Sequence, residues 1–117
     1  MKENAIKNKS FAFAIRIVNL YKYLVEEKKE FVLSKQLLRS GTAIGALTRE
    51  AEHAESKADF IHKFKIADKE IKETEYWLLL CKKAEKYPSP NDDIFNQLKS
   101  IENITSKIII TSKKYNK

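Results

Sequence analysis

Apolar residues recur along much of the chain at alternating steps of three and four, the spacing that places side chains on one face of an α-helix. The longest such run occupies positions 60, 64, 67, 71, 74, 78 and 81. A sustained alternation of this kind is typical of a helix that packs lengthwise against its neighbours in a bundle. Three shorter runs have the same period. The four runs predict helices over residues 10–29, 34–55, 57–86 and 91–113.

Serine residues stand at the starts of the first three predicted helices. Ser10 and Ser34 are candidate N-caps of the first two, because a serine hydroxyl can accept a hydrogen bond from a free backbone N–H in the first turn. Ser56 is followed three residues later by Asp59. This pair resembles a capping box with aspartate in place of glutamate, and it predicts the start of the third helix.

Composition agrees with an all-α fold. The 117 residues include only two Gly and two Pro, too few for the many turns of a β-sandwich or barrel. A Pro-rich stretch at 87–91 predicts the turn before the last helix, which Asn91 or Asp92 can cap. Four amphipathic segments with short connections most simply form an antiparallel up-down-up-down four-helix bundle. We expect one domain over residues 1–117.

The chain has more apolar side chains than one bundle core can hold. The segments at 11–18 and 76–81 are apolar on nearly all sides. A helix without a polar face has to be covered on both sides, and the simplest cover is another copy of the chain. We therefore expect a homo-oligomer. The candidate helix-packing or subunit contacts among the large apolar residues are Phe11, Trp77, Leu79 and Leu80.

Both glycines lie inside the second predicted helix, at Gly41 and Gly45. Each costs on the order of 1 kcal/mol relative to alanine in a helix interior, so a compensating interaction is expected. With small neighbours around them, the two glycines predict a patch on which another helix packs closely. A phosphate-binding glycine loop is disfavoured because no strand precedes the pair.

The charge balance favours anionic partners. The chain has 23 Lys and Arg against 16 Asp and Glu, a formal charge of +7. Lys65, Lys69 and Lys72 fall on one outward stripe of the third predicted helix. Acidic residues are interleaved with this stripe, so a solvated face of ion pairs is the competing interpretation. The candidate contacts to nucleic acid or a partner are Arg39, Arg49, Lys65, Lys69, Lys72, Tyr76, Lys113, Lys114 and Lys117.

No catalytic or metal-binding constellation emerges from the spacing. Glu50-x-x-His53 and Asp59-x-x-His62 resemble parts of a di-iron site, but both pairs lie off the apolar stripes of their helices. Cys81 falls on an apolar seam with no histidine nearby in the sequence, which is typical of a core thiol. We therefore expect no enzymatic activity, no cofactor and no metal site.

The start of the chain lacks the apolar core of an export signal, and no apolar run approaches the ~20 residues of a membrane span. A single cysteine excludes an internal disulfide and fits a reducing compartment. These features predict a soluble, cytoplasmic protein.

The order and spacing of four segments are distinctive. They read SFAFAIRIV at 10–18, LSKQLLRSGTAIGA at 33–46, SKADF at 56–60 and KEIKETEYWL at 69–78. With them the chain resembles the bacterial four-helix bundle family of 23S rRNA-intervening sequence proteins, also known as S23 ribosomal proteins. It departs from the family at Leu47 and Thr48, where members commonly carry Asn-Ile.

The resemblance implies an antiparallel four-helix bundle that assembles as a homopentamer, with a basic surface and no known catalytic activity. A relative of the family, the accessory variability determinant of diversity-generating retroelements, partners a reverse transcriptase and binds nucleic acid. Two functions therefore stay open. One is binding of RNA or a nucleoprotein through basic surfaces, and the other is a protein-interaction scaffold or accessory subunit with no nucleic-acid role of its own.

Overall fold

The computed structural model of the chain describes residues 2–84 and 90–114, and the side chains from residue 5 onward. Four helices account for nearly all of this part, and its remaining residues form turns and bends without any strand. This confirms the predicted all-α class. The helices are α1 (Lys2–Glu26), α2 (Leu33–Glu52), α3 (Lys57–Lys83) and α4 (Asp92–Lys114).

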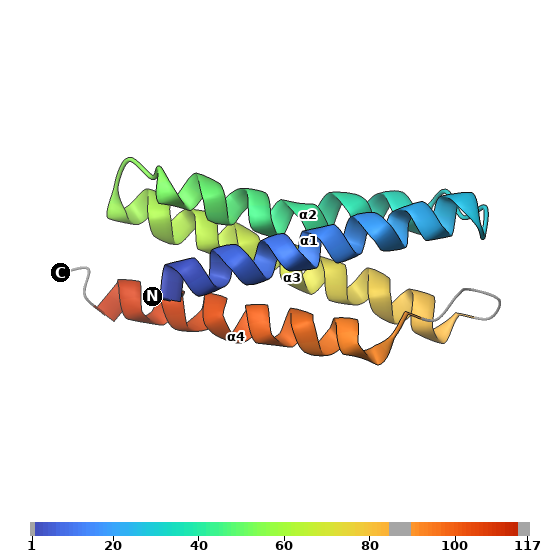
Figure 1. Cartoon of the computed structure of the whole chain (residues 1–117). Coiled ribbons are helices and arrows are strands. Elements are labelled where there is room, and N and C mark those ends of the chain that lie inside the picture. Colours follow the sequence, from blue (N-terminus) through green and yellow to red (C-terminus); the bar gives the residue numbers. More distant parts are fainter. Residues whose placement is uncertain (1, 85–89, 115–117) are drawn as a thin grey trace.

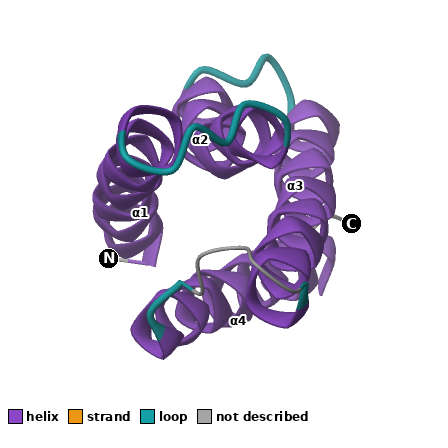
Figure 2. Cartoon of the chain, turned by 90° about the vertical axis from the view of Figure 1, so that its right-hand side faces the viewer, coloured by secondary structure: helices purple, strands orange, loops and turns teal. Residues whose placement is uncertain are grey.

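The helices lie side by side in a ring (Figures 1 and 2). Each helix contacts the next one along the chain, and α4 returns to contact α1. Within the described residues, the diagonal pairs α1–α3 and α2–α4 make no close backbone approach. The start of α1, the α2–α3 turn and the end of α4 share one end of the bundle, here called the terminal end. The opposite end, which holds the α1–α2 loop, is called the loop end.

Helix α1 begins at Lys2, so the predicted start at Ser10 is wrong. The apolar stripe extends one turn further toward the N-terminus, because Ile6 is fully buried in line with Phe13 and Ile17. Ser10 lies inside the helix, where its hydroxyl donates to the carbonyl of Lys7 over 3.2 Å. A buried serine at this position is a packing residue and not a cap. The helix also ends earlier than predicted, at Glu26.

Helix α2 begins at Leu33, and the predicted capping role of Ser34 is wrong. The Ser34 hydroxyl donates back to the carbonyl of Glu30 over 2.9 Å. The cap is instead the Glu30 carboxylate, which accepts from the backbone N–H groups of Val32, Leu33 and Ser34 over 3.0, 3.0 and 2.7 Å. One side chain in the loop thus satisfies three free donors of the first turn. The helix ends at Glu52, three residues short of the predicted limit.

Helix α3 starts as the sequence predicts. The Ser56 hydroxyl accepts from the N–H of Asp59 over 3.0 Å, and the Asp59 carboxylate accepts from the N–H of Glu55 over 3.2 Å. The reciprocal bond goes to the residue before the cap, which is a small departure from the standard capping box. On the predicted seam Phe60 is half-buried and its neighbour Ile61 is buried instead. The remaining seam residues are buried as predicted, and α3 ends at Lys83 rather than at 86.

Helix α4 has its predicted stripe inside the bundle, with Ile94, Leu98, Ile101, Thr105 and Ile108 all buried. The β-branched residues 108–111 near its end are helical. Asn91 supplies the cap, since its side-chain oxygen accepts from the N–H of Asp93 over 3.0 Å. The predicted turn at 87–91 falls mostly on 87–89, which lie outside the described residues.

Three threonines are buried on the helix seams, where a threonine hydroxyl can bond a carbonyl of its own helix. The Thr48 hydroxyl donates to the carbonyl of Ile44 over 3.0 Å, and the Thr74 hydroxyl lies 2.7 Å from the carbonyl of Glu70. Thr74 is also 2.9 Å from the Ser40 hydroxyl, so this one pair forms a buried polar link between α2 and α3. The Thr105 hydroxyl has no hydrogen-bond partner among the described residues. None of the helices, over the residues described, is both long and apolar enough to cross a membrane.

Candidate nucleic-acid interface

Several of the candidate cations are neutralised by carboxylates. Arg39 on α2 pairs with Glu73 and, over 3.3 Å, with Glu70, both on α3. Lys72 pairs with Glu102 of α4, which also binds Lys99 over 3.0 Å. Glu102 is buried between these two lysines, with 9% of its surface exposed. For Arg39 and Lys72 the ion-pair interpretation therefore applies, since their charge is already matched across a helix interface.

Arg49 has a different kind of partner. Its guanidinium carbon lies 5.4 Å from the centre of the Phe11 ring, within the range of a cation–π contact between α2 and α1. Both side chains are exposed. Arg49 keeps its charge at the surface, beside an aromatic ring of a second helix.

Lys65 and Lys113 bring two cations together at the terminal end. The charge of Lys65 on α3, a side-chain contact with it and a smaller effect of burial lower the pKa of Lys113 on α4. Both lysines and Lys69 are exposed, and none of the three has a carboxylate within ion-pair distance among the described residues. This group of Lys65, Lys69 and Lys113 is called the lysine cluster. Like charges held together without a counter-charge favour a bound anion.

The other candidates near the chain end contribute less to a defined surface. Lys114 is exposed in the last turn of α4, and Lys117 lies outside the described residues. Lys7 pairs with Glu52 over 3.2 Å, so a carboxylate at the end of α2 neutralises part of the charge at the terminal end. Tyr76 lies on α3 with 58% of its surface exposed and packs edge-on against Trp77, with ring centres 5.3 Å apart.

Gly41 and Gly45 face α1. A Cβ added at Gly41 would lie 2.8 Å from Cγ1 of Ile17, and one at Gly45 would lie 3.4 Å from the carbonyl oxygen of Ser10. The first distance is too short for two carbons, so Gly41 allows an approach of α1 and α2 that alanine would disturb. The buried serine and the two glycines thus form opposite sides of one close helix contact.

Large apolar side chains are exposed on two diagonal helices. On α1, Phe11 and Ile15 are 53% and 49% exposed, one turn apart. On α3, Leu79 is 41% exposed beside Tyr76. Trp77 is half-buried against the core, and its indole N–H has no partner among the described residues. Leu80 is half-buried as well. The four predicted contact residues thus divide into two exposed side chains, Phe11 and Leu79, and two half-buried ones, Trp77 and Leu80.

The residues considered for catalysis or metal binding form no grouped site within the part of the chain that the structure describes. Glu50 pairs with Lys63 over 2.9 Å, and His53 and His62 are exposed. Within 2–84 and 90–114, no three or more His, Cys, Asp or Glu side chains are grouped so that they could hold a metal ion. Cys81 is buried, and burial, with a smaller contribution from the Glu30 carboxylate, raises the pKa of its thiol to about 11. The thiol therefore stays protonated at neutral pH.

Comparison with known proteins gives a consistent result. Residues 2–110 match the family of 23S rRNA-intervening sequence proteins. The chain is 56% identical to a protein of unknown function from the S23 ribosomal protein family of Bacteroides thetaiotaomicron VPI-5482, known from its crystal structure. That likeness covers 93% of this chain and 98% of the other, with a TM-score of 0.89. No curated protein matches. The chain belongs to the family of 23S rRNA-intervening sequence proteins.

Proposed function

We propose that this protein is a non-enzymatic bundle that binds RNA through phosphate contacts to the lysine cluster on α3 and α4. The observation that carries the proposal is that Lys65, Lys69 and Lys113 are exposed and have no carboxylate within ion-pair distance among the described residues; the charge of Lys65 also lowers the pKa of Lys113. A phosphate between two such ammonium groups would replace repulsion by attraction. Arg39 and Lys72 are poorer candidates because each already has a carboxylate partner.

Binding of this kind is electrostatic and tolerant of sequence. A lysine ammonium is a point charge, without the fixed fork of donors with which arginine reads a base edge. Lys65, Lys69 and Lys113 therefore position a phosphate backbone but carry little information about the bases. Repetition of the cluster in a homo-oligomer would let several weak contacts on one RNA add up.

The test is binding of a single-stranded RNA across a salt series. Replacing Lys65, Lys69 and Lys113 together by Gln should weaken binding at low salt and reduce the slope of log K against log salt by about 0.7 per lysine, or about 2 in all. The matched control replaces the exposed Lys22, Lys28 and Lys35 at the loop end by Gln. The control removes the same charge from another place, so its slope should stay close to that of the wild type.

Equal binding by the two triple variants would mean that total charge matters and the lysine cluster does not. No binding by the wild type at low salt would exclude the RNA function. In that case the protein-interaction scaffold, or an accessory subunit, takes its place. Capture of a protein partner that does not weaken with added salt is the result expected for a scaffold.

A second candidate property is self-association into a ring, the homopentamer that the family resemblance implies. The exposed apolar pairs, Phe11 with Ile15 and Tyr76 with Leu79, lie on the diagonal helices α1 and α3. The face on α1 differs from the face on α3, so a contact between them joins unlike surfaces of two copies. Contacts between unlike surfaces generate rings when the rotation closes.

Light scattering tests this assembly. We expect the wild type to be an oligomer and the double variant Ile15→Glu with Leu79→Glu to dissociate, because a buried charge at each side of the contact is unfavourable. Ile110→Glu is the matched control, since Ile110 is 66% exposed but lies on α4. A monomeric wild type would contradict the assembly, and an oligomer of another size would contradict only the pentamer.

A further inference from the structure

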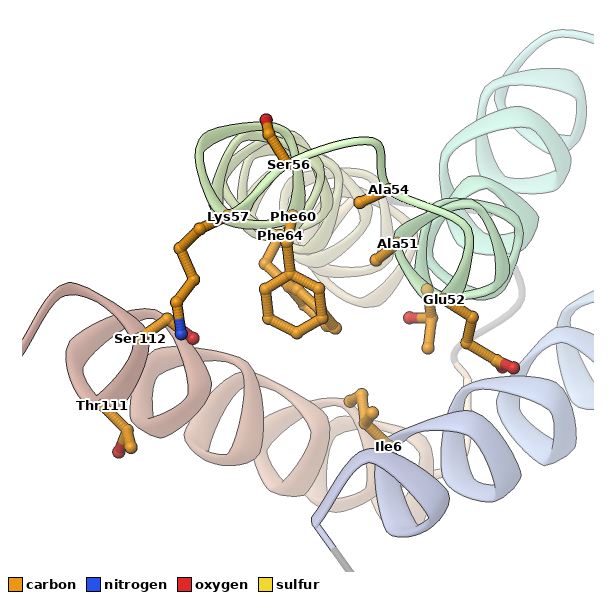
Figure 3. A pocket seen from close by; sticks show the side chains of 11 residues that line it. Ile6, Ala51, Glu52, Ala54, Ser56, Lys57, Phe60, Phe64, Thr111 and Ser112 are labelled. Carbon is orange, nitrogen blue, oxygen red and sulfur yellow. The ribbon is translucent and has the colours of Figure 1, made fainter. Parts of the chain in front are cut away.

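The terminal end of the bundle holds a cavity of about 700 Å³. It opens where the start of α1, the end of α2, the start of α3 and the end of α4 surround a space that the side chains of the described residues leave open (Figure 3). The closing residues on α2 and in the turn after it are small, namely Ala51 and Ala54. Ligand cavities in proteins are typically about 300 to 1,000 Å³, so this volume suits a small molecule.

The inner wall of the cavity is apolar. Ile6 reaches in from α1, and Phe60 and Phe64 reach in from α3 (Figure 3). Ile6 and Phe64 are almost fully shielded from solvent by the bundle, while Phe60 is half-buried at the edge of the core. Thr48 adds a hydroxyl, but that group already donates within its own helix. An apolar wall of this kind holds water poorly and favours an apolar ligand.

The mouth of the cavity is polar, and the described residues that line it include one cation, Lys57. The Lys57 ammonium extends across the opening toward Ser112 of α4 (Figure 3). Among the described residues it has no ion pair or hydrogen bond. The carboxylate at the mouth, Glu52, is paired with Lys7 over 3.2 Å. The negative charge of the mouth is therefore matched, whereas the charge of Lys57 is open to an incoming anion.

We propose that this cavity binds an amphipathic monocarboxylate, a molecule with an apolar body and one anionic head. The body would lie against the half-buried ring of Phe60, over the floor that Ile6 and Phe64 form, and the carboxylate would pair with Lys57 and accept from the Ser112 hydroxyl at the mouth. A charge-assisted hydrogen bond at a partly shielded site is stronger than a neutral one, so the head fixes the orientation of the ligand. Fatty acids and aromatic acids share this chemistry.

Calorimetric titration of the full chain with decanoate, 2-naphthoate and decanol tests the proposal. We expect one decanoate or one 2-naphthoate to bind per chain, and whichever binds tighter identifies an alkyl or an aromatic body. Decanol should bind at least about tenfold more weakly, because it has no charge for Lys57. Lys57→Gln should reduce carboxylate affinity to the level of decanol, while Lys83→Gln, at an exposed lysine of the same helix outside the cavity, should leave it unchanged.

A second variant tests the contribution of the cavity independently of the charge of Lys57. Ala54→Leu places a larger side chain at the half-buried edge of the cavity and should abolish binding of both carboxylates without unfolding the bundle, as circular dichroism would verify. Equal affinity for decanoate and decanol would overturn the role of Lys57. Absence of binding by the wild type, or full binding by Ala54→Leu, would overturn the site itself. None of these outcomes depends on RNA binding, which uses other residues.

Discussion

The contact between α1 and α2 and the terminal end of the bundle are built in opposite ways. Along the α1–α2 contact, Gly41 and Gly45 leave no space between the helices, and Glu30 satisfies three backbone donors at the loop. At the terminal end a cavity is open, and the charges of Lys57 and Lys65 are not matched by carboxylates within the described part of the chain. Close packing with satisfied polar groups stabilises a fold, whereas space and unmatched charge are what a ligand requires.

The largest expected effect comes from breaking the tight contact. Gly41→Leu should lower the free energy of unfolding by about 3 kcal/mol, because a Cβ already lies too close to Ile17 and three further carbons have no room. Chemical denaturation measures the change. Gly45→Ala is the control, since its Cβ would meet Ser10 at an ordinary 3.4 Å and alanine favours the helix. A leucine variant as stable as the wild type would show that α1 and α2 are not held this closely.

A somewhat smaller effect is expected at the loop end of the same contact. Glu30→Ala removes the acceptor for the N–H groups of Val32, Leu33 and Ser34, which should cost about 2 kcal/mol of stability and loosen the first turn of α2. Hydrogen exchange of these amides would rise locally. Glu27→Ala, an exposed glutamate earlier in the loop, should change neither quantity. Unchanged exchange in the Glu30 variant would mean that water replaces the cap at no cost.

The smallest expected effect concerns the pKa values of two lysines, Lys63 and Lys113. A hydrogen bond and ion pair with Glu50 raise the pKa of Lys63 above 10.5, and the charge of Lys65 lowers the pKa of Lys113 below 10.5. Lys63 therefore contributes stability that is present below pH 10.5 and is lost as the pH rises through its folded pKa. Lys113 binds fewer protons when folded, so its contribution makes stability rise as the pH approaches 10.5 from below.

Lysine titration by nuclear magnetic resonance measures both shifts. Lys65→Gln should return the pKa of Lys113 toward its ordinary value and leave that of Lys63 unchanged. If Lys113 titrates normally in the wild type, the two ammonium groups do not lie together, and the lysine cluster loses its distinguishing feature.

Features that depend on a few neighbouring residues could be predicted from the sequence. The start of α3 is an example, since Ser56 and Asp59 form their hydrogen bonds within one turn. The stripe of α4 was also predicted correctly, because apolar residues rarely repeat at this spacing by chance. Ser10 shows the opposite case. A serine before an apolar run suits an N-cap locally, but here its small size serves the contact with Gly45, which only the packing of two helices reveals.

The candidate site was less predictable for a related reason. Arg39 and Lys65 look alike in the sequence, and their difference depends on how the neighbouring helix is rotated and shifted. Arg39 faces two glutamates across the α2–α3 contact, and Lys65 faces another lysine across the α3–α4 contact. The cavity was missed as well, because it depends on where four helix ends stop relative to one another.

The burial of Cys81 makes the reactivity of its thiol a measure of how often the bundle opens. It is the single cysteine of the chain, it lies toward the loop end of α3, and its thiol is both shielded and protonated at neutral pH. A thiol reagent reacts with Cys81 only when α3 separates from its neighbours. The rate at which Cys81 is labelled in the native protein therefore depends on how often this opening occurs. Binding of a ligand at the terminal end can then be detected, without any dye or engineered probe, by slower labelling of Cys81 at the loop end.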